Sequence, residues 1–355
     1  MPLQTATVFN WALKINGTEV TDPFGGLNFS HTISGFGTSG VATGQFEFDL
    51  YDESGYYGMA LLEGASVQLF EADNRMSPSR EYYISSRSIS HKICHFVAYD
   101  RMSFTDQPFK VSGAGVPNDD GRYYCGNVLS AIAAQCGFSS MNPTGGGLDL
   151  IQFTAEQLQD RTCRDVLEMV AEAMCGVWIC DSGNSAVLSC LGATYDSLGV
   201  SDSYTEIDYQ GRQQITALML TNSDTGKVVS YSTGAYGTAI YIESPFVGGT
   251  ELDSVVWGRL QNCVYQAWHC DKALLGGFIP TSAKIDFGGT ELLANNVNLA
   301  VDSTGIYFSG GCDPQDESQW GYDDYLTRKK LEADKLIGHT KITNTGRIVF
   351  VNKNK

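Results

Sequence analysis

The first part of the chain alternates apolar and polar residues with a period of two, which is the pattern of a β-strand with one buried face. The side chains of Phe46, Phe48 and Leu50, for example, fall on one face of such a strand. The segments that show this pattern are 44–51, 64–72, 81–90 and 91–99. Strands at regular spacing with glycine-rich connections predict a small barrel or sandwich in residues 1–104.

The spacing of the apolar residues then changes to that of a helix. Residues 127–138 place Val128, Ile132 and Cys136 on one stripe. Gly137 follows at the position where a left-handed residue often ends a helix. We therefore expect a helix that stops at this glycine.

A second helix is predicted over residues 162–178. Thr162 can cap its first turn, with Asp165 at the third position of a capping box, and Gly176 is expected to end it. Two strands joined around residues 181–185 are expected next, at 177–180 and 186–190.

The last part of the chain returns to strands, with one helical interruption. Strands are expected within 205–243, and one helix is expected over 253–270 with Asp253 as its cap. The remaining predicted elements are strands between 283 and 311, an amphipathic helix over 322–338 and a hairpin across 344–346. The predicted layout is β, then α/β, then β interrupted by a helix, then a short α/β tail.

Composition supports a β-rich protein. Charged residues make up 18% of the 355, and there are 39 Gly, 18 Tyr and 17 Phe, which suits strands joined by tight turns. The net charge is −17, although residues 321–355 carry eight Lys/Arg against four Asp/Glu. Because phosphate contacts need clustered Lys and Arg, this acidic body argues against specific nucleic-acid binding.

Targeting signals and cysteine chemistry narrow the class of protein further. The N-terminus lacks the basic start and apolar stretch of a signal peptide, and no apolar run is long enough to span a membrane. The ten cysteines are therefore expected to be reduced and mostly buried. The close pairs Cys175/Cys180 and Cys263/Cys270 do not have zinc-site spacing.

The chain offers little that resembles a catalytic centre. None of the five histidines stands in a metalloprotease or deaminase motif, and His91 and His95 lack a carboxylate nearby in the sequence. No nucleophile elbow, Walker loop or dinucleotide-binding motif is present. The carboxylate pairs at 52–53 and 119–120 lie in predicted turns. We expect no catalytic, cofactor-binding or metal-binding residue, and thus no enzyme.

One short stretch invites a closer look, because an aromatic residue stands next to an ion pair at the end of a strand. Tyr99, Asp100 and Arg101 close the strand 93–99 just before the helical segment begins. They are either part of an active site or the corner between two domains.

The order of elements resembles one family, the baseplate hub proteins of phage tails and phage-like particles. Related modules form the N-terminal part of tail-associated lysins. The segments that carry the resemblance are 62–69, 82–86, 97–102, 127–138 and 162–183, and the terminal helix and strand at 322–338 and 343–351. Each motif is weak alone, but their order matches over nearly the whole chain.

The resemblance implies an α+β, β-rich fold with two tube-type β-barrel domains. The implied units are a first barrel at 1–104, an α/β peripheral domain at 105–200, a second barrel at 201–320 with a helical insertion near 246–280, and a C-terminal helix and hairpin at 321–355. Asp100 would then cap the turn that leaves the first barrel, and Arg101 would pair locally or across a subunit interface. Tyr99, Asp100 and Arg101 are thus structural residues.

The resemblance also implies a function and partners. The expected protein is a homotrimeric ring at the virion tail tip, assembled in the cytoplasm of the host bacterium. It would join the tail tube or distal tail protein to the spike or tail-tip protein, contact other baseplate proteins, and pass DNA or the tape measure protein through its lumen. Any lytic activity would belong to another subunit. Two alternatives stay open, a cell-wall hydrolase and a glycan-binding adhesin module, the latter suggested by the many Tyr and Trp.

Overall fold

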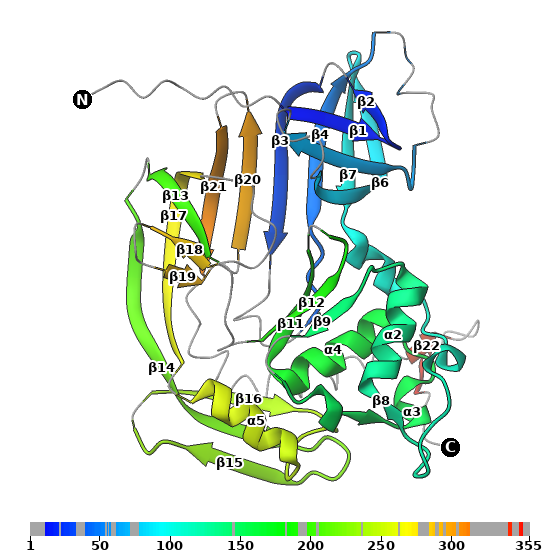
Figure 1. The fold of residues 1–355 in the computed structure, drawn as a ribbon, viewed down its shortest axis with the longest axis vertical. Helices are drawn as coiled ribbons and strands as arrows, with labels where there is room; N and C mark the ends of the chain where they lie inside the picture. Colours follow the sequence, from blue (N-terminus) through cyan, green and yellow to red (C-terminus); the bar gives the residue numbers. More distant parts are fainter. Residues whose placement is uncertain are drawn as a thin grey trace.

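The fold of the 355-residue chain is described here from a computed structural model. The described residues are 11–20, 23–32, 40–53, 55, 57, 62–71, 78–143, 146–181, 183–190, 197–203, 206–235, 237–261, 263–275, 284–287, 291–293, 296–302, 305–312, 340–342 and 348–350. Strands outnumber helices among them, and several helices are grouped in the middle of the chain (Figure 1). The predicted β-rich α+β class is confirmed.

One 16-stranded sheet dominates the described part of the chain, and its main path runs β19-β18-β13-β17-β21-β20-β3-β4-β7-β6-β5-β1-β2. The early strands are β1 (Trp11–Ile15), β2 (Thr18–Val20), β3 (Pro23–Thr32), β4 (Gln45–Tyr51), β5 (Ser66–Glu71), β6 (Pro78–Ser90) and β7 (Ile93–Tyr99). The late strands are β13 (Ser197–Ser203), β14 (Asp208–Thr221), β15 (Val228–Ser232), β16 (Thr238–Glu243), β17 (Val264–Leu275), β18 (Lys284–Asp286), β19 (Glu291–Leu293), β20 (Asn296–Asp302) and β21 (Gly305–Cys312). The antiparallel pair β3–β20 joins the early set to the late set (Figure 1).

The early strands have the predicted apolar and polar faces. Phe46 and Phe48 of β4 are buried, and they lie opposite Ala98 and Phe96 of β7. The rings of Phe48 and Phe96 stack with their centroids 5.0 Å apart. Burying each such ring contributes about 2 kcal/mol of hydrophobic stabilisation. The alternate β4 side chains, including Glu47, point to the other face and stay partly exposed.

Two closed barrels are not confirmed. Among the described strands, β2 and β19 lie at opposite ends of the main path. The early strands do not close on themselves, because β3 pairs with β20. The two predicted β-regions are therefore two halves of one continuous sheet in this chain.

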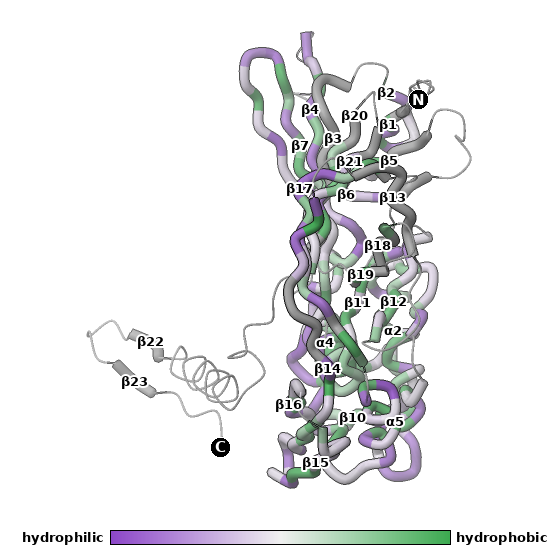
Figure 2. The backbone as a smooth tube through the Cα atoms, turned by 90° about the vertical axis from the view of Figure 1, so that its left-hand side faces the viewer, coloured by the Kyte–Doolittle hydropathy of each residue, from purple (hydrophilic) through white to green (hydrophobic). Residues whose placement is uncertain are grey.

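Between the two sets of strands lies a region of helices, strands and 3₁₀ turns that we call the α/β lobe (residues 101–190). Its elements are η2 (Arg101–Asp106), η3 (Val111–Ala114), β8 (Tyr123–Tyr124), α2 (Cys125–Cys136), β9 (Met141–Pro143), η4 (Leu148–Leu150), β10 (Gln152–Phe153), α3 (Ala155–Leu158), α4 (Cys163–Met174), β11 (Gly176–Cys180) and β12 (Ala186–Cys190). The helices lie beside the three-stranded sheet β11-β12-β9, whose strands β11 and β12 are strongly hydrophobic (Figure 2). Trp178 is fully buried there, and its indole N–H donates to the carbonyl of Leu167.

The predicted helix ends in this lobe are largely confirmed. Gly137 ends α2 with a φ of 74°, a left-handed conformation that costs glycine little. Thr162 and Asp165 form the predicted capping box of α4. The residue that ends α4 is Cys175, however, and Gly176 already belongs to β11. A Cβ on Gly176 would lie 2.8 Å from the carbonyl oxygen of Ser189, so this glycine permits close strand pairing.

The predicted helix over 253–270 is wrong in its second half. Helix α5 covers Glu251–Leu260, and the chain then forms β17, which pairs with β13, β14 and β21. The apolar spacing of this segment fits either a helix or a buried strand, and the three partner strands decide the outcome. Asp253 is also not the cap itself, because Thr250 is the cap and Asp253 completes its capping box.

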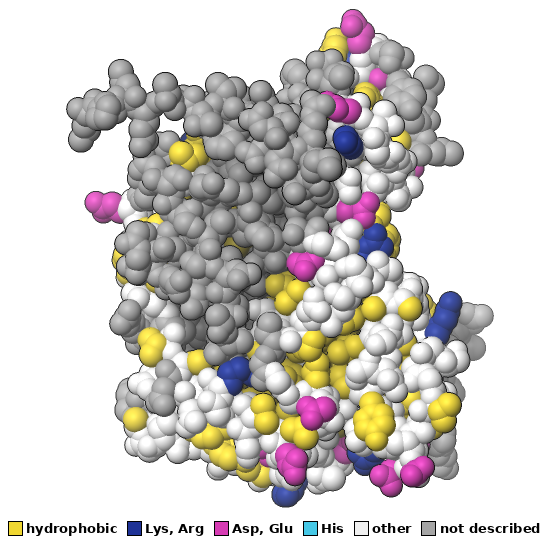
Figure 3. All heavy atoms as spheres, viewed as in Figure 1, with side chains coloured by type: hydrophobic (Ala, Val, Ile, Leu, Met, Phe, Trp, Pro, Cys, Tyr) yellow, Lys and Arg dark blue, Asp and Glu magenta, His cyan; other side chains and the backbone are white. Residues whose placement is uncertain are grey.

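The second half of β14 forms a small sheet with β15 and β16, against which α5 packs (Figure 1). In the space-filling view, hydrophobic side chains gather over the half of the molecule that contains α5 and the α/β lobe (Figure 3). Near the C-terminus, β22 (Thr340–Ile342) and β23 (Ile348–Phe350) form the predicted hairpin. The predicted helix over 322–338 lies outside the described residues. No helix in the described part of the chain is long and apolar enough to span a bilayer.

Candidate functional site: the junction around Asp100 and Arg101

Asp100 lies at the junction between β7 and the 3₁₀ helix η2, and it is fully buried. One carboxylate oxygen accepts the backbone N–H of Met102 at 3.0 Å and so caps η2. The other accepts the backbone N–H of Gly44 at 2.9 Å. A buried carboxylate is tolerated when it accepts such hydrogen bonds. The carboxylate therefore fixes both the turn after β7 and the segment that leads into β4.

The guanidinium of Arg101 has partners in other segments of the chain. Its guanidinium donates to the carboxylate of Glu81 at 3.1 Å and lies 4.8 Å from the ring centroid of Tyr83. It also reaches the carbonyl oxygen of Cys136 at the end of α2, at 3.5 Å. Arg101 therefore connects the early sheet to the α/β lobe.

Tyr99, the third residue singled out by the sequence, is the last residue of β7. It lies opposite Gln45 on one side and Tyr83 on the other, and its side chain is half-buried. Its neighbours Ala98 and Asp100 are fully buried. The three residues thus lie together at one corner, where Asp100 and Arg101 contact different parts of the molecule.

Glu81 of β6 collects three donors that come from separate segments. Besides Arg101, its carboxylate accepts the hydroxyl of Tyr83 and the side-chain amide of Asn184, the latter at 2.8 Å. Asn184 lies in the turn between β11 and β12, where it has a left-handed φ of 58°. Glu81 therefore ties that turn to the early sheet.

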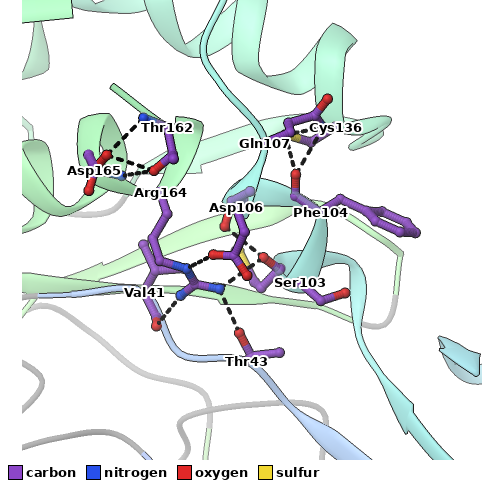
Figure 4. Close-up of polar contacts among 12 residues, drawn as sticks. Val41, Thr43, Ser103, Phe104, Asp106, Gln107, Cys136, Thr162, Arg164 and Asp165 are labelled. Carbon is purple, nitrogen blue, oxygen red and sulfur yellow. Dashed lines mark hydrogen bonds and ion pairs between the residues drawn. The ribbon is translucent and has the colours of Figure 1, made fainter. Parts of the chain in front are cut away.

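A second arginine, Arg164 in the first turn of α4, connects the lobe to the segment that leads into β4. Its guanidinium donates to the carbonyl oxygen of Val41 and the hydroxyl of Thr43, both at 3.0 Å, and pairs with Asp106 of η2 (Figure 4). It also reaches the carbonyl oxygen of Met102 at 3.2 Å. The planar guanidinium can serve several acceptors at once, which a lysine ammonium could not do in the same geometry.

The segment before β4 also joins the sheet of the lobe. Val41 forms a parallel bridge with Trp178 of β11, and backbone hydrogen bonds run from Ala42 to Trp178 and from Trp178 to Gly40. Residues 40–44 therefore contact Trp178 and Arg164 of the lobe, and Asp100 just before it. Together with Arg101 and Glu81, these contacts form what we call the junction.

Sequence reasoning missed Glu81, Asn184 and Arg164. The first two carry no local signal, because their partners lie elsewhere in the chain. Arg164 does carry a local signal. A positive charge in the first turn of a helix is unfavourable beside the helix dipole, which indicates a negatively charged partner nearby. The carboxylate of Asp106 is that partner.

The other candidates do not assemble into a reactive centre in the described residues. His95 has the carboxylate neighbour that its sequence surroundings did not suggest, because Nδ1 lies 2.7 Å from Asp49 on the adjacent strand β4. His269 pairs with Asp271 on the surface at 3.0 Å. No group of three or more His, Cys, Asp or Glu side chains in the described part of the chain is arranged to hold a metal. The contacts of the junction can fix the position of two parts of the molecule relative to each other.

We compared the chain with known proteins by sequence and by structure. No family model matches the sequence, and no curated protein matches it. Among solved structures, the 43 kDa tail protein of prophage MuSo2 from Shewanella oneidensis aligns with a TM-score of 0.52 and 10% identity. The alignment covers 86% of this chain and 98% of that one. The chain has the fold of a phage tail protein.

A second solved structure supports the same conclusion. The prophage tail protein gp18 from Listeria monocytogenes EGD-e aligns with a TM-score of 0.50 and 9% identity, over 91% of this chain and 99% of that one. Both alignments span nearly the full length of both proteins, so the likeness involves the arrangement of the sheet and the lobe together. The expected resemblance to phage tail proteins is thus present at the level of the fold.

Proposed function

We propose that this chain is a structural hub subunit of a phage or phage-like tail. The observation that carries the proposal is the near full-length fold shared with two prophage tail proteins. The junction supports it, because Asp100, Arg101 and Arg164 use their polar groups to hold the α/β lobe against the early sheet. A part that transmits force between a tube and a tip needs such a fixed connection.

In this proposal three copies form a ring that joins the tail tube or distal tail protein to the spike or tail-tip protein. The proposed units remain 1–104, 105–200, 201–320 and 321–355, with the first and third contributing the tube-type walls of the ring. Tyr99, Asp100 and Arg101 serve as structural residues of the first boundary, and the chain has no catalytic role of its own.

The proposed lumen is lined by the polar face of the sheet, which carries Glu47 and Asp49 of β4 opposite the buried Phe46 and Phe48. Negative charge on such a wall repels the phosphates of passing DNA. The net charge of −17 is of the right sign for this role.

The deciding experiment is an image of the purified protein and of particles at the tail end. The full-length chain is mixed with its tail-tube partner, its mass is measured by light scattering, and the complex is imaged by electron microscopy with the subunit labelled. A three-membered ring at the tube end supports the hub. A monomer that clears purified peptidoglycan would favour the hydrolase, and a monomer that binds glycans would favour the adhesin.

A further inference from the structure

The hairpin between β6 and β7 projects from one end of the early sheet (Figure 2). Its two-residue turn consists of His91 and Lys92. Strand β4 ends beside this hairpin, with Tyr51 opposite Ile93. We call residues 88–93 together with Tyr51 the hairpin tip.

The hairpin tip exposes apolar side chains on both of its faces. Ile89 is 56% exposed and Tyr51 is 43% exposed. They belong to opposite faces, because Ile89 lies opposite Cys94 while Tyr51 lies opposite the preceding residue, Ile93. Apolar residues on both faces are typical of a strand that is covered on both sides. The hairpin tip therefore has the pattern of an element that inserts into a groove of a partner.

The turn of the hairpin tip is not the most stable one for a hairpin of this length. His91 and Lys92 have φ angles of 48° and 67°, in the left-handed region that favours glycine. A two-residue turn with two such angles prefers Asn-Gly, because a long side chain is unfavourable at both positions. Backbone strain of this kind concentrates at binding sites. It indicates that the side chains of His91 and Lys92 are needed for contacts beyond the hairpin.

The hairpin is positively charged within an acidic protein. Residues 85–94 contain Arg87 and Lys92 and no Asp or Glu, whereas the whole chain has a net charge of −17. Glu53 lies 3.7 Å from Nζ of Lys92, but both side chains remain more than half exposed. Such an exposed ion pair contributes little to stability, so Lys92 can also approach a carboxylate of a partner. Another copy of this acidic chain is complementary in charge to the hairpin.

We propose that the hairpin tip of each copy inserts into the neighbouring copy and forms the copy-to-copy contact of the tail ring. This inference rests on the proposed function, which requires such a contact. A projecting tip does not fit an identical tip, so it contacts a different surface of the next copy. Contacts between unlike surfaces produce rings when the rotation from copy to copy closes. Ile89 and Tyr51 are the apolar anchors of this contact, and Lys92 lies at its charged rim.

The test measures assembly of the full-length protein, alone at high concentration and with its tail-tube partner. Light scattering gives the mass of the assembly, and dilution gives its dissociation constant. We expect the double variant Y51S/I89S to weaken assembly by at least about tenfold. The matched variant V228S/V264S removes two valines that are 55% and 57% exposed in β15 and β17, and it should assemble like the wild type. Equal effects of the two variants would overturn the proposal.

The turn allows a second measurement, which a failure to fold could not imitate. The variant H91N/K92G should raise the thermal midpoint by roughly 2–4 °C, because Asn and Gly adopt left-handed φ angles more easily. The same variant should weaken assembly by about two- to fivefold, because the positive charge of Lys92 is lost. A more stable variant that assembles as well as the wild type would contradict the proposal.

Cross-linking identifies what the hairpin tip contacts. A photoreactive benzoylphenylalanine in place of Ile89 should join two copies of the chain into a product of twice the chain mass. A link to another tail protein alone, or no link within an assembled ring, would overturn the proposal and leave the hub in place. A chain that never assembles, alone or with its tail-tube partner, would instead overturn the hub and the hairpin contact together.

Discussion

The guanidinium of Arg164 donates to the carbonyl oxygen of Val41 at 3.0 Å across a separation of 123 residues. With Thr43, Met102 and Asp106 as its further partners, this one side chain contacts two segments of the junction, residues 40–44 and η2. The packing of the α/β lobe against the early sheet therefore depends on Arg164, a residue of helix α4 and not of the sheet.

Replacing Arg164 by Ala should lower the free energy of unfolding by about 2–4 kcal/mol, because several partly buried acceptors lose their donor. Urea denaturation followed by tryptophan fluorescence measures the loss. Arg161→Ala is the control, since that side chain is exposed on the same segment and should change stability by less than about 0.5 kcal/mol. Equal effects of the two substitutions would show that the Arg164 contacts do not hold the junction.

Replacing Asp100 by Ala should cost at least about 1 kcal/mol, because the N–H groups of Met102 and Gly44 lose their acceptors. The variant Asp100→Asn keeps one acceptor oxygen and should lose less. Thermal unfolding of both variants beside Asp119→Ala, which changes an exposed carboxylate, provides the comparison. A destabilisation no greater than that of the control would contradict the capping role.

Asp253 is fully buried and accepts the backbone N–H groups of Gly248, Gly249 and Thr250. The substitution Asp253→Ala should therefore destabilise the protein by about 2–3 kcal/mol and speed amide exchange across 248–250. Hydrogen exchange with mass spectrometry locates the effect. Ser254→Ala, at the exposed next position of α5, should leave the exchange of these amides unchanged.

Burial raises the pKa of the Cys125 thiol from 9.0 to about 12. The unfolded chain therefore releases this proton at a lower pH than the folded protein does. Its contribution to stability is complete below pH 9 and is lost as pH rises toward 12, with a slope of up to about 1.4 kcal/mol per pH unit. Urea titrations of wild type and Cys125→Ala between pH 8 and roughly 11 should show the steeper decline in the wild type. Parallel curves would mean that this thiol does not contribute.

Under the proposed function, reversing the charge of Glu47 and Asp49 should turn the lumen wall from repelling DNA to attracting it. We expect the double variant E47K/D49K, once assembled, to bind double-stranded DNA at low salt and to release it as salt rises. Fluorescence anisotropy with a labelled duplex measures binding. The matched variant E156K/E251K makes the same charge change at exposed positions of α3 and α5. Equal DNA binding by both variants would contradict the proposal that the Glu47 and Asp49 face of the sheet lines the lumen.

The sequence correctly predicted those parts of the fold that depend on residues close together in the chain. The end of α2 at Gly137 and the capping box of Thr162 and Asp165 depend on neighbours within one turn, and both were predictable. The segment from Val264 onward was not, because its apolar spacing fits two structures and strands β13, β14 and β21 select one.

The junction was predictable only in part, for the same physical reason. The sequence identified Tyr99, Asp100 and Arg101 at the end of a strand, where a chain turns. The partners that give them their role, Glu81 and the backbone of residue 44, are specified by tertiary packing and leave no local pattern.

The pairing of β3 with β20 has a consequence for how the chain is made. During synthesis, β3 leaves the ribosome long before residues 296–302 are made. The backbone N–H and C=O groups on this edge of β3 therefore lack their β20 partners until late in synthesis. An unpaired strand edge is a site for association with the wrong chain. Premature contact between nascent copies is therefore the hazard built into this topology, and completion of the sheet by β20 removes it.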